Sequence, residues 1–337
     1  MPTFCRHNRF IERCPICSKT RAGRSPGTAS AKPRHAATKG PPVRTRHPRL
    51  RAGGHEVRVQ RESRAGDDGY RSALLPGIRA SADAQLLAEE IAFASGRLLK
   101  LGAAPPDLYG EVRACAEDDI ERATWMCFLI AYLSPLDGDD PFLAIRMVLD
   151  AVGDGGDLSD AEASGDLSAV ALGPHTSHDP TRGIQTLLAY RRWAELAGSQ
   201  ARAFEGDPAW GPQRRFERLF ERLALPGLPR IGRYDLLVTL GRLGLYEMRA
   251  DALHFTSGPE STVSDHTTLA AKRVFAIGDP LNLERRARAL AKAIAVPIET
   301  LDLALANWST GERAALGFRV ETCDRHALER CLEALEL

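Results

Sequence analysis

The chain has 337 residues, enough to bury one large core or two modest ones. No run of 18 apolar residues occurs and the N-terminus lacks an apolar signal-peptide core, so we expect a cytoplasmic protein without a membrane span. The net charge of +1 is unevenly distributed, because residues 1–80 carry 18 Lys and Arg against 5 Asp and Glu. The remainder is acidic, with 27 Lys and Arg against 39 Asp and Glu.

Residues 1–20 contain cysteine and histidine at the spacing of a zinc knuckle. Cys14 and Cys17 stand two residues apart in CPIC, and Cys5 and His7 precede them. Thiolates and imidazole suit Zn²⁺, and four such ligands make a closed structural site. A redox CxxC pair or unused thiols are the alternatives, but no thioredoxin-like βαβ pattern surrounds the motif. The sequence therefore predicts a zinc-binding knuckle whose metal supplies its folding energy.

Residues 21–80 are rich in Arg, Gly, Pro, Ser and Ala and lack periodic apolar positions. Such a segment cannot offset the entropy of folding, so we expect a flexible basic linker. A basic arm on an acidic body is typical of an arm that meets nucleic-acid phosphate, and a merely solvated tail is the alternative.

Helical patterns begin near Ser81 and continue to residue 310, so the body is predicted to be all-α. Residues 118–134 are apolar on every side, which is typical of a helix at the centre of a core. Residues 181–205 are predicted to form one long helix. Further helices are predicted over 266–276, 281–295 and from Pro297 through Trp308. After residue 310, a C-terminal extension combines a short strand-like stretch, GFRVET, with a final helix.

Residues 213–244 predict two helices joined by a turn that contains LPGLPRIGR. The first helix has one apolar face. Its members recur at helical spacing: Phe216, Leu219, Phe220 and Leu223. Leu225, Pro226 and Gly227 stop this helix, and Gly232 opens the second one.

The start of the second hairpin helix is a candidate phosphate site, because the first N–H groups of a helix have no partner within it. We predict nucleic-acid contacts by Gly227, Arg230, Gly232, Arg233 and Tyr234. The two arginines would add charge-assisted bonds to phosphate. Many all-α proteins contain a similar hairpin without binding anything, so this motif leaves the function open.

Asp251 follows the hairpin, between residues that should be buried, and is the candidate catalytic acid. Its neighbours Leu253 and Phe255 are apolar, so we expect the carboxylate to be partly buried. A surface ion pair with Arg249 is the alternative role.

The hairpin resembles the helix–hairpin–helix of DNA glycosylases, whose turn reads LPGxGR and is three residues shorter. Residues 128–134, FLIAYLS, resemble the buried helix that precedes the hairpin in this superfamily. The resemblance implies a glycosylase-like body over residues 81–310, with Asp251 at the place of the catalytic Asp. Tyr234 stands where lyase-type glycosylases carry Lys, so a glycosylase of this kind would be monofunctional.

Four motifs together are similar to the alpha-glutamyl/putrescinyl thymine pyrophosphorylase family, clade 3: the CPIC arm, FLIAYLSPLDGDDPF, ALPGLPRIGRYDLL and KRVFAIGDP. This family is associated with hypermodified thymine in phage and bacterial DNA. The resemblance implies that an amine or amino acid displaces pyrophosphate from the methylene carbon of a 5-substituted pyrimidine.

Two other functions remain open at this point. One is base excision by a monofunctional glycosylase that uses a buried Asp251. The other is a DNA-binding adaptor without catalysis, because a fold does not establish an activity. DNA is the expected partner in all three cases, and the sequence does not indicate an oligomeric state.

Overall fold

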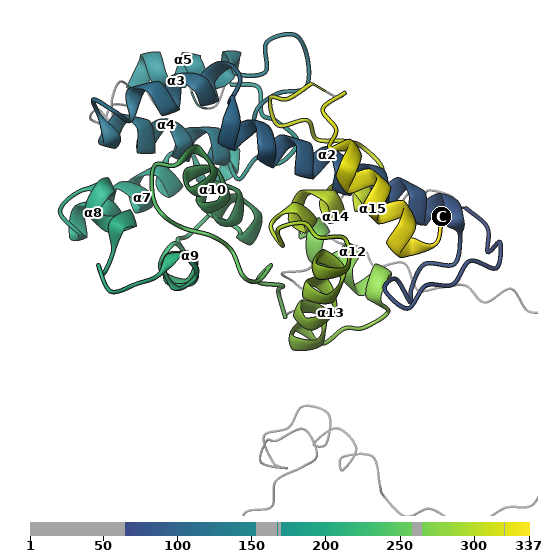
Figure 1. Ribbon diagram of the computed structural model, residues 1–337. Helices are drawn as coiled ribbons and strands as arrows, with labels where there is room; N and C mark the ends of the chain where they lie inside the picture. The colour runs from purple at the N-terminus through teal and green to yellow at the C-terminus, as the bar shows by residue number, and fades with distance from the viewer. Residues whose placement is uncertain (1–64, 153–166, 168–169, 258–264, 320) are drawn as a thin grey trace, which may run out of the picture. The chain divides into compact units, whose positions relative to one another are not determined.

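The computed structural model describes residues 65–152, 167, 170–257, 265–319 and 321–337 (Figure 1). All described residues belong to one compact unit, Glu62–Leu337. The described residues form helices, turns and bends but no β-strand, so the all-α prediction is confirmed for them. The strand-like stretch GFRVET is a turn region where it is described, because Gly317 has a positive φ of 80°.

The described helices are connected by turns and loops. In chain order they are α2 (Ser81–Ala103), α3 (Asp107–Cys115), α4 (Ile120–Leu133), α5 (Leu143–Val152), the 3₁₀ helix η2 (Pro180–Arg182), α7 (Gln185–Leu196), α8 (Gln200–Glu205), α9 (Pro212–Arg222), α10 (Arg230–Leu243), α12 (His266–Phe275), α13 (Pro280–Ala293), α14 (Thr300–Thr310) and α15 (Arg325–Leu335).

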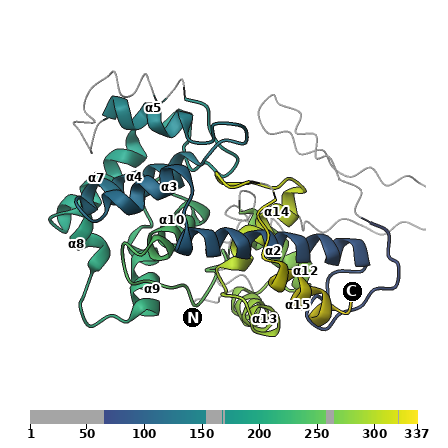
Figure 2. The same ribbon diagram turned by 45° about the horizontal axis from the view of Figure 1, so that its top comes forward.

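Helix α2 connects two groups of helices. It packs against α14 and α15 on one side and against α10 on the other. Helices α12, α13 and α14 pack on one another, whereas α4 packs against α3, α5, α8 and α10. Figures 1 and 2 show α2 running from one group to the other in both views.

Helix α4 lies at the centre of its group, as its all-round apolar sequence predicts. Every residue from Ala123 to Leu133 is buried. Asp119 caps the helix, accepting a hydrogen bond from the backbone N–H of Arg122 at 3.0 Å. The rings of Phe128 and Tyr190 stack at 3.7 Å between centroids, which fixes α7 against α4.

The predicted long helix over 181–205 is instead divided into η2, α7 and α8. Gly198 has a positive φ of 96°, which ends the helical path after α7. Ser199 then caps α8, because its Oγ accepts a hydrogen bond from the N–H of Arg202 at 3.2 Å.

Both ends of the compact unit pack onto α2 and its neighbours. Leu75 and Ile78 are buried, and the N–H of Gly77 bonds to the carbonyl of Val274 at 2.8 Å. The flexible linker predicted over 21–80 therefore ends before these residues, because their apolar side chains join the core. The hydroxyl of Tyr70 donates to the carbonyl of Leu335 at 2.8 Å, so the 311–337 extension shares this unit.

The four predicted zinc ligands, Cys5, His7, Cys14 and Cys17, lie outside the described residues, so the zinc knuckle stays a prediction. Within the described ranges, no group of three or more His, Cys, Asp or Glu side chains is arranged to hold a metal ion. No described helix has the length and apolar character needed to span a bilayer.

Candidate functional site

The predicted hairpin consists of α9, a turn over residues 223–229 and α10, which begins at Arg230 rather than Gly232. Gly227 has a positive φ of 81° in the turn, and a Cβ there would lie 2.1 Å from Thr186 Oγ1. Glycine is therefore required at this position both by the backbone and by the close approach of α7.

Gly232 packs against the loop that precedes α7. A Cβ at this position would lie 2.1 Å from the Oγ of Ser177, and Gly232 is buried. The N–H of Ser177 is in turn bonded to the carbonyl of Tyr132 at the end of α4, at 2.8 Å. Gly232 thus serves close packing of α10 in this structure, which is a different role from the predicted phosphate contact.

Arg230 is 4% exposed and directs all three nitrogens inward. Its Nε donates to Asp265 at 2.9 Å, one Nη to Asp302 at 2.7 Å and the other to the carbonyl of Leu253 at 2.8 Å. Burial acts to lower the pKa of Arg230, but the charges of Asp302 and Asp265 outweigh it and raise the pKa. The predicted phosphate contact is therefore wrong for Arg230, because its donors are used inside the protein.

Arg233 and Tyr234 also bind the protein itself. One Nη of Arg233 donates to the carbonyl of Phe220 at 3.0 Å, and the guanidinium lies 4.4 Å from the centre of the Phe220 ring. Burial and the neighbouring Arg230 lower the pKa of Arg233. Tyr234 is buried and its hydroxyl donates to the carbonyl of Ala252 at 3.1 Å, so a nucleic-acid contact by Tyr234 is wrong for this structure.

The segment 251–255 is held in place by a carboxylate from α13. Glu284 accepts hydrogen bonds from the N–H of Leu253 at 2.9 Å and of Phe255 at 3.1 Å. Between them, His254 adopts a positive φ of 56°, which is uncommon for a residue other than glycine. The two bonds on either side fix this strained backbone and with it the direction of the imidazole.

Asp251 is exposed rather than partly buried, with 74% of its side chain accessible. Leu253 and Phe255 turn into the core, whereas the carboxylate of Asp251 points outward. Its ion-pair partner is Arg288 of α13, at 3.7 Å, rather than the expected Arg249. The Nε of Arg288 also donates to the carbonyl of Asp251 at 2.8 Å, so this residue is anchored at its backbone.

His254 lies against the first hairpin helix, and its ring stacks on that of Phe220 at 4.1 Å between centroids. Burial, with smaller effects from Arg230 and Arg233, lowers the pKa of His254 to about 4. The imidazole is therefore neutral at pH 7 and can both donate and accept hydrogen bonds.

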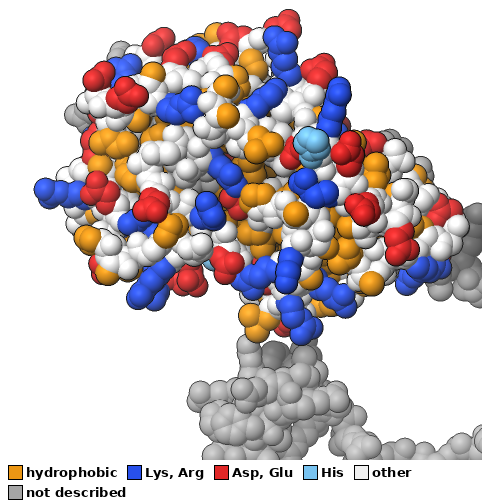
Figure 3. Space-filling model, viewed as in Figure 1, with side chains coloured by type: hydrophobic (Ala, Val, Ile, Leu, Met, Phe, Trp, Pro, Cys, Tyr) orange, Lys and Arg blue, Asp and Glu red, His pale blue; other side chains and the backbone are white. Residues whose placement is uncertain are grey.

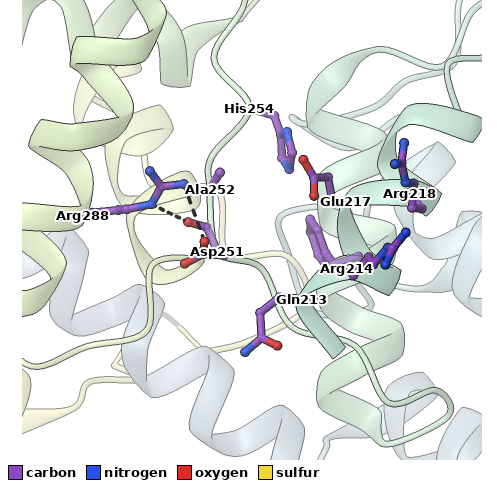
Figure 4. A pocket seen from close by; sticks show the side chains of 9 residues that line it. Gln213, Arg214, Glu217, Arg218, Asp251, Ala252, His254 and Arg288 are labelled. Atoms are coloured by element: carbon purple, nitrogen blue, oxygen red, sulfur yellow. Dashed lines mark hydrogen bonds and ion pairs between the residues drawn. The ribbon is translucent and has the colours of Figure 1, made fainter. Parts of the chain in front are cut away.

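Asp251 and His254 line the same cavity, which has a volume of about 390 Å³ (Figure 4). Its walls are α9, the 251–254 segment and Arg288 of α13. This volume lies in the range of roughly 300–1,000 Å³ that is common for ligand sites. The lining contains three arginines, Arg214, Arg218 and Arg288, and two acidic residues, Glu217 and Asp251, of which Asp251 contacts Arg288. With a neutral His254, these lining side chains sum to one net positive charge, while Arg218 also forms an ion pair with Glu221 at 3.0 Å.

Arginine side chains continue from the cavity onto both flanking helices. On α9, Arg214, Arg218 and Arg222 follow at intervals of four and are exposed, so they form one stripe. Arg285 and Arg288 are exposed on α13. Figure 3 shows Lys and Arg side chains gathered on the lower part of the face where Figure 1 places α9 and α13. This basic surface, made of these five arginines, is a candidate for phosphate contacts.

Sequence analysis singled out Asp251 as a site residue but missed Glu284 and Arg288. These two stand four residues apart on α13, so a shared helix face was detectable. Their contacts with the 251–255 segment were not detectable, because they span 29 to 37 residues and no spacing rule links positions so far apart.

Comparison with known families gives one match over this region. Residues 174–320 match the family described as alpha-glutamyl/putrescinyl thymine pyrophosphorylase clade 3. The matched range contains the hairpin, the 251–255 segment and α13, and hence the whole lining of the cavity. No curated protein and no solved structure matches the chain. Residues 174–320 are therefore similar to the alpha-glutamyl/putrescinyl thymine pyrophosphorylase family, clade 3, and this match covers less than half of the chain.

Proposed function

We propose that this chain is a DNA-binding enzyme that acts on a 5-substituted pyrimidine and replaces its pyrophosphate with an amine or amino acid. The observation that carries the proposal is the arginine-rich cavity beside Asp251 and a neutral His254, inside the segment that matches the family. The glycosylase-like arrangement of the helices remains a prediction from the sequence motifs.

The arginines of the cavity suit the leaving group. Pyrophosphate carries several negative charges, and a guanidinium binds phosphate oxygens through two parallel hydrogen bonds. In the proposed reaction the bond between the methylene carbon and the pyrophosphate oxygen breaks, and its electron pair leaves with pyrophosphate. Arg214, Arg218 and Arg288 would stabilise the charge that develops on that oxygen.

Asp251 and His254 suit the incoming amine. The amine nitrogen forms the new bond to the methylene carbon and afterwards loses a proton. The exposed carboxylate of Asp251 attracts the amine and accepts this proton directly or through water. A neutral His254 offers a hydrogen-bond acceptor to the amine without adding a positive charge that would repel it.

The basic surface on α9 and α13 would hold the DNA backbone on either side of the cavity. Its arginines neutralise phosphates irrespective of base sequence. The basic N-terminal arm adds further positive charge to the same chain, and its zinc knuckle would fold that arm locally.

The exposure of Asp251 favours transfer over base excision. A glycosylase of the type considered needs a buried carboxylate beside the sugar, whereas Asp251 is open to solvent and paired with Arg288. A non-catalytic adaptor would use the same basic surface, so turnover is the measurement that separates it from an enzyme.

The test uses DNA whose thymines carry a methylene-linked pyrophosphate, incubated with the full chain and a mixture of amines. Mass spectrometry of the digested DNA should find an amine-bearing pyrimidine nucleoside and one pyrophosphate released per modified base. Free base with abasic sites would identify an excision enzyme instead. Unchanged DNA after binding would identify an adaptor.

A further inference from the structure

The imidazole of His254 is the outer layer of a stack that begins inside the protein. The guanidinium of Arg233 lies over the Phe220 ring, 4.4 Å from its centre. The imidazole of His254 lies on the same ring at 4.1 Å between centroids, with 16° between the two planes. Two groups this close to one ring centre would collide on a single face, so Arg233 and His254 occupy opposite faces of Phe220. The stack therefore runs from Arg233 through Phe220 to His254.

Each layer of this stack is held in place by the protein. One Nη of Arg233 donates to the carbonyl of Phe220 at 3.0 Å, and Phe220 is buried. The backbone on either side of His254 is bonded to Glu284, at 2.9 Å and 3.1 Å. A ligand that adds to a surface fixed in advance loses little free energy to the ordering of side chains.

The outer part of the His254 ring belongs to the wall of the 390 Å³ cavity. Phe220 covers one face of the imidazole, and Phe216 of the same helix lies nearly parallel to it at 6.1 Å. His254 is nevertheless only half-buried. Figure 4 shows it on the α9 side of the cavity, with Arg288 on the other side. The stack therefore ends on a flat aromatic surface that faces the cavity.

We propose that His254 is the stacking platform for the pyrimidine ring of the substrate, which forms the next layer on Arg233, Phe220 and His254. The identity of this ring as a DNA base rests on the function proposed above, whereas the preference of the cavity for a flat ring does not.

The platform suits an uncharged, planar ring. Burial lowers the pKa of His254 to about 4, so the imidazole presents an uncharged π face at pH 7. Stacking uses only the face of a base, which leaves its polar edge and its 5-substituent to Arg214, Arg218 and Asp251. A pyrimidine has fewer heavy atoms than the drug-sized ligands of cavities with roughly 300–1,000 Å³, so the ring and its substituent fit together.

Isothermal titration calorimetry of the full chain without DNA tests the platform with three probes that share one phosphate. They are thymidine 5′-monophosphate, its 5,6-dihydro derivative and 2-deoxyribose 5-phosphate. Saturation of the C5–C6 bond makes the ring non-planar but keeps its sugar, its phosphate and its carbonyl groups. Thymidine 5′-monophosphate should bind more tightly than either other probe by about fivefold or more, the usual effect of stacking one base on an aromatic side chain.

Three variants assign that preference to the ring of His254. His254→Asn removes the ring, keeps a polar side chain and tolerates the positive φ, so it should bind the planar and the saturated nucleotide equally. Its binding of 2-deoxyribose 5-phosphate should not change. His254→Phe should keep the preference, because a phenyl ring retains the π face. His266→Asn makes the same substitution at an exposed position of α12 and should behave as wild type.

The proposal is overturned if wild type binds the planar nucleotide no more tightly than the saturated one or the sugar phosphate. It is also overturned if His254→Asn, folded as judged by its melting temperature, keeps the wild-type preference. If His254→Phe does not fold, wild type and His254→Asn decide the question. A preference that His254→Asn abolishes, without any amine-bearing product in DNA, would support the platform and reject the transfer reaction.

Discussion

A single buried guanidinium, that of Arg230, joins three segments that are far apart in the sequence. It bonds to Asp265 before α12, to Asp302 in α14 and to the carbonyl of Leu253. Because the last of these bonds lies beside His254, the position of the candidate site depends on a residue that does not line it. Removing one partner of a buried ion pair leaves the other charges uncompensated, which is costly.

Replacing Arg230 should therefore destabilise the fold. We expect Arg230→Met to lower the free energy of unfolding by about 3–5 kcal/mol, because Asp265 and Asp302 would remain buried without their cation. Urea unfolding followed by circular dichroism measures the change. Arg214→Met is the matched control, since Arg214 is exposed on α9 and should shift stability by less than about 0.5 kcal/mol. Equal stability of the two variants would contradict the buried network.

Replacing Asp251, in contrast to replacing Arg230, should leave the stability of the fold nearly unchanged. Asp251→Asn removes the charge of an exposed side chain, so its stability should stay within about 0.5 kcal/mol of wild type. If the carboxylate takes the proton of the amine, turnover should fall by about 10²–10⁴-fold, the usual contribution of general base catalysis. Single-turnover rates on pyrophosphate-bearing DNA measure this effect. A stable variant with wild-type rates would remove Asp251 from the mechanism.

His254 makes stability depend on pH in a defined direction. Its pKa is about 4 in the folded chain and about 6.5 when unfolded, so between these values the unfolded state binds a proton that the folded state does not. Stability should be fully present above pH 6.5 and decline as the pH falls toward 4. The maximum slope from one group is about 1.4 kcal/mol per pH unit.

His254→Asn isolates this contribution, because asparagine does not titrate and tolerates the positive φ at this position. The variant should show a shallower loss of stability between pH 6.5 and 4 in urea unfolding series. His175 also has its pKa lowered to about 4, mainly by burial, so part of the slope should persist. A slope identical to wild type would mean that His254 is already open to solvent.

Local sequence patterns predicted the helices whose ends and apolar faces are determined by residues close to them in the sequence. The apolar face of α9 and the Asp-capped starts of α12 and α13 follow spacing and capping rules. The break between α7 and α8 was missed, because Gly198 in an otherwise helical pattern is also compatible with a continuous helix. The ion pairs of Arg230 span 35 and 72 residues, and no local rule connects such positions.

The glycines of the hairpin also show that local sequence does not identify contacts with distant segments. Their presence signals a special backbone or a close approach, but the sequence does not say what approaches. Gly232 was expected to admit a phosphate, and the structure places the Ser177 hydroxyl there. A loss of DNA binding in a Gly232 variant would therefore report disturbed packing rather than a lost phosphate contact.

The packing role of Gly232 can be tested at the level of the hairpin. Gly232→Ala should lower stability by about 1–3 kcal/mol, because its Cβ would lie 2.1 Å from Ser177 Oγ. Gly211→Ala is the control, since a Cβ at the start of α9 meets no described atom within 4 Å and φ there is −69°. Adding Ser177→Ala to Gly232→Ala should recover part of the loss in thermal unfolding. No difference between the two glycine variants would reject the close approach.

Over the whole molecule, the net charge of +1 conceals how the charges are placed. The acidic total after residue 80 predicts a body that repels DNA, yet the basic surface on α9 and α13 presents five exposed arginines. Composition gives the sum of charges, whereas the fold determines which of them share a face. Residues 1–64, which hold most of the basic arm, lie outside the described residues.

The salt dependence of DNA binding tests the basic surface. Each phosphate that a side chain neutralises contributes about 0.9 to the slope of log affinity against log salt concentration. We expect the double variant Arg214→Ala and Arg222→Ala to reduce that slope by about 2 and to weaken duplexes of different sequence alike, because phosphate contacts carry no base information. Fluorescence anisotropy from 50 to 300 mM salt, a range of about sixfold, gives the slope.

The control makes the same change of charge on another helix and the segment before it. Arg319→Ala and Arg325→Ala remove two exposed cations from the turn before α15 and from α15 itself. If binding responds only to net charge, the two double variants should lose equal slope, and the basic surface on α9 would have no special role. If DNA lies across the cavity, only the α9 variant should lose slope. The α9 variant should also lose more activity at high salt than at low salt, because weaker DNA binding then limits the rate.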